Sequence, residues 1–157
     1  MRRALLVLSV LSLLLLPTRA EAATYGGWKV VASDPRTSAF HCGGPYLPVV
    51  GVYIYECVVV SGTYWQAVTI FHPTNTQRDV VGNTEGWING TLAADVNCTG
   101  SGAAPVGQWL ECFTPTTHSL AGYYIQGQAG WLGANLPNGS SWAVSPNAGY
   151  NSPTWQL

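Results

Sequence analysis

Charged side chains are scarce in this sequence of 157 residues, because only 8% of them are Asp, Glu, Lys or Arg. Soluble domains ordinarily contain about 25%. After residue 22 the chain keeps three basic residues, Lys29, Arg36 and Arg78, against six acidic ones. A nucleic-acid-binding protein needs a basic face for the phosphates. We therefore expect no nucleic-acid partner, and the same scarcity disfavours polyphosphates and anionic membrane surfaces.

The familiar catalytic motifs are also lacking. The sequence contains no HExxH zinc motif and no GxSxG nucleophile motif. Its three histidines, His41, His72 and His118, stand in strand-end or turn-like contexts without a recognisable orienting partner. We therefore expect a non-enzymatic protein with no catalytic residue, no metal and no cofactor.

Long apolar runs occur only at the N-terminus. A basic Met1-Arg2-Arg3 precedes the apolar stretch 4–16, and Ala20-Glu21-Ala22 forms a small-x-small cleavage site. This pattern predicts a secretion signal over residues 1–22 and an extracellular mature protein. The apolar stretch falls short of the roughly 20 residues that a bilayer requires, so we expect no membrane span.

Four cysteines stand in the mature chain, at Cys42, Cys57, Cys98 and Cys112. Outside the cytosol an even number of cysteines is most simply paired in disulfides, and neither a CxxC motif nor a zinc-type spacing is present. Four cysteines allow three pairings. We favour the two local closures, Cys42–Cys57 and Cys98–Cys112, while the other two pairings remain open.

Helical periodicity is absent after the signal. Short β-branched and aromatic runs alternate with Gly, Pro and Asn, which predicts strands and turns. Asn89-Gly90 is the strongest hairpin signal. We expect one all-β domain, an immunoglobulin-like or jelly-roll-like antiparallel β-sandwich of about seven or eight strands, with residues 23–48 as an N-terminal arm and 49–157 as the sandwich. Candidate strands lie at 28–32, 49–61, 64–72, 78–81, 106–113, 123–128 and 141–144, the hairpin is expected over 85–91, and 37–48 is expected as a loop.

Two carboxylates immediately precede cysteines on apolar strands, in Glu56-Cys57 and Glu111-Cys112. If both cysteines face the core, alternation along a strand turns both glutamates outward. Two carboxylates flanking a groove are the minimal apparatus of a glycoside hydrolase. We favour the simpler interpretation, two solvated side chains on sheet faces, and keep the hydrolase as a third alternative.

Aromatic residues are abundant, with seven tryptophans and eight tyrosines. If Leu110 and Cys112 point inward, Trp109, Glu111 and Phe113 share an outward face. Exposed aromatic rings can stack on sugar rings while carboxylates bind the hydroxyl groups, so these three residues are the candidate glycan-binding site. Because aromatic residues dominate burial in cores, four others are expected to fill the core: Trp28, Trp65, Trp87 and Trp142.

Side chains with oxygen ligands concentrate between residues 79 and 97. Calcium takes six to eight oxygen ligands, many of them from loops. The segment contains no EF-hand loop, so we favour ordinary turn chemistry over a metal site. The residues are Asp79, Asn83, Glu85, Asn89, Asp95 and Asn97.

Several short motifs occur from about residue 49 to the C-terminus: Cys57-Val58-Val59-Val60-Ser61-Gly62-x-Tyr64-x-Gln66-Ala67-Val68, Cys98, Cys112-Phe113-Thr114-Pro115-Thr116-Thr117, and a late Ser145-Pro146 or Ser152-Pro153. In these motifs the chain resembles small, uncharacterised secreted β-domain proteins of high-GC Gram-positive bacteria. The resemblance implies a secreted β-domain with two disulfides and a bacterial host, and no site residue comes with it.

The sequence thus favours a secreted, monomeric, non-enzymatic β-sandwich module acting at or near the cell surface. The first alternative is a carbohydrate-binding domain that uses exposed aromatic side chains. A polysaccharide or the cell-wall surface is the expected partner in that case.

Overall fold

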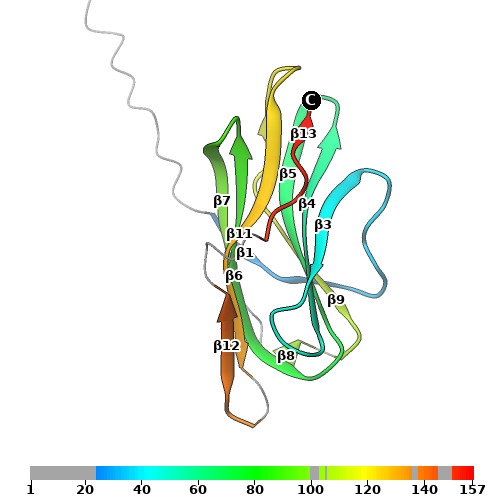
Figure 1. The fold of residues 1–157 in the computed structure, drawn as a ribbon, viewed down its shortest axis with the longest axis vertical. Helices are drawn as coiled ribbons and strands as arrows, with labels where there is room; N and C mark the ends of the chain where they lie inside the picture. The colour runs from blue at the N-terminus through cyan, green and yellow to red at the C-terminus, as the bar shows by residue number, and fades with distance from the viewer. Residues whose placement is uncertain (1–23, 100–102, 105, 136–137, 145–149) are drawn as a thin grey trace, which may run out of the picture.

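Two β-sheets pack face to face in the computed structural model (Figure 1). The structure describes residues 24–99, 103–104, 106–135, 138–144 and 150–157, and the expected signal at 1–22 lies outside them. No helix occurs in these residues, which confirms the all-β class. The sheets have seven and six strands, more than the seven or eight strands expected, because several added strands are only two to four residues long.

The first sheet has the order β1-β7-β6-β11-β12. β1 runs parallel to β7, whereas β7, β6, β11 and β12 are antiparallel to their neighbours. Two short strands are added to it, β8 on β6 and β13 on β11. The bounds are β1 Thr24–Gly27, β6 Gln77–Ile88, β7 Thr91–Thr99, β8 Ala103–Ala104, β11 Tyr124–Asn135, β12 Ser141–Val144 and β13 Trp155–Gln156.

The second sheet has the order β2-β9-β5-β4-β3, and all its pairs are antiparallel. β4 and β5 form its centre, and β10 is added on β5. The bounds are β2 Lys29–Val31, β3 Phe40–Tyr46, β4 Val52–Ser61, β5 Tyr64–Pro73, β9 Trp109–Phe113 and β10 Thr117–His118.

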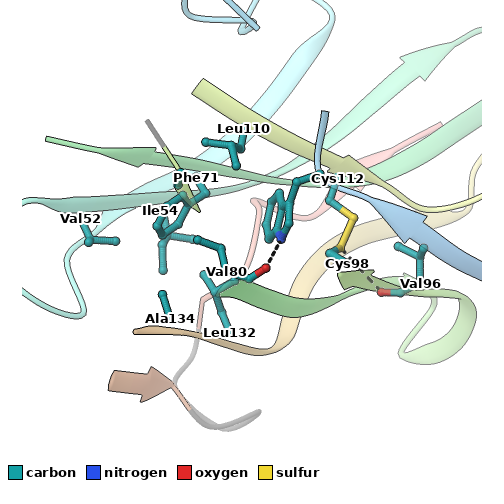
Figure 2. Packing of buried hydrophobic residues seen from close by; sticks show 12 residues of the cluster. Val52, Ile54, Phe71, Val80, Val96, Cys98, Leu110, Cys112, Leu132 and Ala134 are labelled. Carbon is teal, nitrogen blue, oxygen red and sulfur yellow. Dashed lines mark hydrogen bonds between the residues drawn. A yellow bond between two sulfur atoms is a disulfide. The ribbon is translucent and has the colours of Figure 1, made fainter. Parts of the chain in front are cut away.

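The main core lies between the sheets (Figure 2). Ile54 and Phe71 from the second sheet meet Val80 and Leu132 from the first, and all four are fully or almost fully buried. Trp28 lies in the same layer, where its Nε1 donates a 3.0 Å hydrogen bond to the Val80 carbonyl oxygen. This bond satisfies the indole N–H, which would otherwise be costly to bury.

Both disulfides join the pairs favoured from the sequence. Cys42–Cys57 links opposed residues of the neighbouring strands β3 and β4. Cys98–Cys112 instead crosses the core and ties β7 of the first sheet to β9 of the second (Figure 2). Two disulfides are typical of extracellular proteins.

Two expectations about individual strands are wrong. Residues 40–46 were expected within a loop, because Gly43-Gly44-Pro45 disfavours a strand, yet they form β3 at the edge of the second sheet. A register shift between Gly43 and Tyr46 accommodates these residues. Residues 78–81 were expected as a short edge strand, and they belong to the long β6, which is paired on both sides.

Residues 150–157 connect the two sheets. β13 pairs with β11, while Trp155 stacks on His41 of β3 with ring centroids 3.4 Å apart. Tyr46 of β3 donates a 2.5 Å hydrogen bond from its hydroxyl to the Asn151 carbonyl oxygen. This segment therefore covers the opening between β11 and β3.

Candidate functional site

Glu56 does not face solvent, contrary to expectation. Its side chain is 0% exposed and points into the space between the sheets, whereas Cys57 faces the other way toward Cys42. Thr69 Oγ1 donates a 2.9 Å hydrogen bond to Glu56 Oε2, and Thr84 Oγ1 donates a 2.7 Å bond to Thr69 Oγ1. Burial raises the pKa of Glu56 well above its usual value, and the nearby Glu85 charge adds to the rise.

Glu111 lies on the opposite face of the second sheet. It is only 4% exposed, and its Oε1 is 2.8 Å from Nζ of Lys29 on the neighbouring β2. The expectation of two solvated glutamates is therefore wrong for both residues. Because the sheet separates Glu56 from Glu111, the two carboxylates cannot flank one glycosidic bond, which removes the geometric basis of the hydrolase alternative.

Trp109 lies on the same outer face as Glu111 and Phe113, since Leu110 and Cys112 between them belong to the core. Its ring is not an open platform. His72 stacks on it with centroids 4.0 Å apart, and the guanidinium of Arg36 lies 5.3 Å from its centroid. The proposed glycan residues are thus together, but the faces of the indole are already in contact with protein side chains.

Arg36 belongs to the segment that lies over this face. Its guanidinium is 3.8 Å from the centroid of the Tyr55 ring, and it forms an ion pair with Asp34. Hydrogen bonding to Arg36 lowers the pKa of Asp34, and the same contact raises the pKa of Arg36. The arrangement explains the high burial of Tyr55, and it leaves little free aromatic surface around Trp109.

The outer face of the first sheet combines aromatic and polar side chains. On β6, Gly82, Thr84 and Gly86 face the second sheet, so Asn83, Glu85 and Trp87 face outward. β11 contributes outward residues in register with these, and so does β7. We call this surface the β6 face, and it consists of Asn83, Glu85, Trp87, Leu92, Asp95, Asn97, Tyr124, Gln126, Gln128 and Trp131.

Aromatic rings are spaced along the β6 face. Tyr124 is 51% exposed and Trp131 is 40% exposed, and Trp87 lies half-buried between them in the direction of the strands. Tyr124 and Trp131 are seven positions apart on β11, but the register shift at Gly130 takes up one of them, so the remaining six strand steps correspond to about 20 Å. The face is therefore long enough to hold several sugar rings.

Polar atoms converge between these rings, above Gly130. Trp87 Nε1 donates a 3.2 Å hydrogen bond to Glu85 Oε2, and Asn83 Nδ2 donates to Asp95 Oδ1. Asn83 Oδ1 is buried and accepts no hydrogen bond. A Cβ atom at Gly130 would overlap both Asn83 Oδ1 and Glu85 Oε1, so these two acceptors pack against the Gly130 backbone and leave no room for a side chain there.

The charge of Glu85 is disfavoured at this position. Burial raises the pKa of Glu85 most, and the nearby Asp95 carboxylate raises it further, while the hydrogen bond from Trp87 lowers it. The two carboxylates lie directly opposite each other on β6 and β7. Like charges in this arrangement repel.

Only part of the expected oxygen-rich set comes together here. Asn83, Glu85, Asp95 and Asn97 share the β6 face, whereas Asn89 lies in the β6–β7 turn and accepts a hydrogen bond from the Tyr124 amide. In the described part of the chain, no group of three or more His, Cys, Asp or Glu side chains could hold a metal ion. Nor does any helix there have the length and apolarity to cross a membrane.

No protein-family model, curated protein or solved structure matches the chain. Asn83, Glu85 and Asp95 were expected only as oxygen ligands, and Trp87 was expected in the core, whereas it lies half-buried on the outer face of β6. Trp131 lies beyond the candidate strand 123–128, because β11 continues to Asn135 past a register shift between Ala129 and Trp131.

Proposed function

We propose that this protein is a secreted, monomeric, non-enzymatic binding module and that its ligand is carbohydrate, held on the β6 face. The observation that carries the proposal is the alternation of aromatic rings and polar side chains along β6 and β11. Rings present apolar faces to sugar rings, while Gln, Asn and Glu side chains offer both donors and acceptors to hydroxyl groups.

The scarcity of charge supports a neutral or weakly charged polymer over nucleic acid. The separation of Glu56 and Glu111 supports binding without hydrolysis. The outer face of the second sheet is a poorer candidate, because His72 and Arg36 already contact the Trp109 ring.

Two tryptophan variants test where carbohydrate binds. The mature protein is first screened against cell-wall and plant polysaccharides, with release of reducing ends measured alongside. Trp131→Ala is expected to weaken binding at least tenfold, because an exposed stacking ring is lost. Its unfolding free energy should change little, since Trp131 is partly exposed.

Trp109→Ala is the matched control on the opposite sheet. It should retain binding while losing about 1–3 kcal/mol of stability, less than the 3–5 kcal/mol of a fully buried tryptophan. Binding lost in Trp109→Ala and kept in Trp131→Ala would move the site to the second sheet. A wild type that binds no polysaccharide would refute the proposal, and released reducing ends would refute its non-enzymatic part.

A further inference from the structure

Exposed apolar side chains gather at the end of the sandwich where the β4–β5 and β6–β7 turns lie (Figure 1). The loop between β10 and β11 reaches the same end, because β10 pairs with the start of β5. We call this surface the turn end, and it consists of Tyr64, Leu92, Leu120, Tyr123 and Tyr124. Both sheets contribute to it, and Leu120 is its most exposed member at 61%. Large apolar side chains that are exposed together mark an interaction surface.

Main-chain hydrogen bonds join the segments that build the turn end. The Ser119 amide donates a 2.9 Å bond to the Thr63 carbonyl oxygen in the β4–β5 turn, and the Gly122 amide donates a 2.6 Å bond to Leu157. The β6–β7 turn is bonded to β11 in the same way. Behind the turns, Leu157 packs against a buried cluster that includes Trp65. Because these backbone groups are already paired, moving them away from water costs little.

The turn end has no Asp, Glu, Lys or Arg side chain, which is a property of the four segments that build it: 61–66, 86–94, 118–125 and 154–157. The carboxylates of the β6–β7 hairpin, Glu85 and Asp95, lie opposite each other about 13 Å behind its turn. The His118 imidazole and the carboxyl group of Leu157 can carry charge, and the Gly122 amide is bonded to Leu157. The turn end therefore loses little on desolvation and offers no Lys or Arg to an anionic partner.

We propose that the turn end inserts its side chains into the interface of a neutral, zwitterionic lipid bilayer, so that the module binds membranes peripherally. Three of its five side chains are tyrosines, whose rings can enter the apolar region while their hydroxyl groups stay at the headgroups. Leu92 and Leu120 add purely apolar area. Since the turn end lacks Lys and Arg, its binding does not depend on anionic lipid. The inference goes beyond the proposed carbohydrate function.

The shape of the turn end favours a bilayer over a second copy of this chain. Its side chains come from separate turns of both sheets and not from one flat sheet face (Figure 1). A stable protein interface buries about 800 Å² per partner and needs closely matched shapes. A fluid bilayer interface instead adapts to side chains that project from several turns.

Flotation with phosphatidylcholine vesicles tests the inference. The mature wild type is expected to float with the vesicles to the same extent at low and high salt, because no Lys or Arg takes part. Leu120→Asp should lower the partition coefficient at least tenfold, since an apolar contact is lost and a charge must be desolvated. The carbonyl oxygen of Leu120 accepts a hydrogen bond from the Tyr123 amide in a turn, where Asp is well tolerated.

Val50→Asp is the matched control at the opposite end of the sandwich. Val50 is 87% exposed and lies just before β4, whose far end leads into the β4–β5 turn. The same new charge at this position should leave the partition coefficient unchanged. Thermal unfolding of both variants verifies their folds. If Leu120→Asp does not fold, the salt-independent flotation of the wild type tests the inference without any variant.

A wild type that does not float with phosphatidylcholine vesicles would overturn the inference, as would equal losses in the two variants. Binding that needs anionic lipid and disappears in salt would contradict a neutral interface. Self-association in sedimentation velocity that Leu120→Asp abolishes, without vesicle binding, would assign the turn end to a second copy instead. Polysaccharide binding is measured separately, so these outcomes leave the proposed carbohydrate function untouched.

Discussion

A carboxyl group buried between two sheets loses its hydration, and its surroundings must offset that loss. Glu56 receives one hydrogen bond, from Thr69, and its Oε1 has no partner. Burial therefore favours the neutral, protonated form of Glu56 in the folded protein.

The stability of the protein should consequently fall as pH rises. The pKa of Glu56 is higher in the folded than in the unfolded state, so the folded state binds more protons above the unfolded value near 4.5. Urea unfolding from about pH 5 to about pH 8 should show a declining free energy for the wild type and a flatter profile for Glu56→Gln. Parallel profiles for the two proteins would show that Glu56 does not titrate in this range.

At the scale of single elements, the β6–β7 hairpin agrees with its sequence signal. Asn89 and Gly90 have φ angles of 48° and 77°, the left-handed values that a type I′ turn needs. The turn is also held by a 2.8 Å hydrogen bond from the Asn89 amide to the Tyr124 carbonyl oxygen. Local backbone preference and tertiary contacts thus support the same conformation.

Gly90→Ala should lower the free energy of unfolding by about 1 kcal/mol, because a Cβ atom disfavours positive φ. The measurement is chemical denaturation. Gly27→Ala is the matched control, since this strand glycine has no atom within 4 Å of an added Cβ. An equal loss of unfolding free energy in both variants would mean that the positive φ angle of the turn does not cause the destabilisation.

At the scale of the whole molecule, the two disulfides close loops of similar length but join different elements. Cys42–Cys57 joins neighbouring strands of one sheet, whereas Cys98–Cys112 joins the two sheets. Their sequence separations are 15 and 14 residues. Loop-closure entropy alone predicts about 3 kcal/mol for each. Only Cys98–Cys112 joins the two sheets and lies in the main core.

Removing Cys98 and Cys112 by alanine substitution should therefore cost about 1–2 kcal/mol more than removing Cys42 and Cys57, because lost core packing adds to the entropy term. Denaturation of the two double variants measures the difference. Equal costs would show that loop closure accounts for the whole effect.

Composition and spacing alone predict much of the architecture. Strand-length runs with turn residues predict an all-β chain, and an even cysteine number with two short separations favours the observed pairing. Asn89-Gly90 predicts its turn because the φ preference is local. These properties depend on near neighbours in the chain.

Which side chains of each strand face the main core was decided by the tertiary structure. β4 is apolar on both sides, so alternation cannot tell whether Glu56 or Cys57 faces the main core. Pairing with β3 and packing against the first sheet turn Glu56 inward. The irregular register at Gly130 likewise brings Trp131 onto the β6 face. Both outcomes depend on contacts between residues distant in sequence, which a local pattern does not encode.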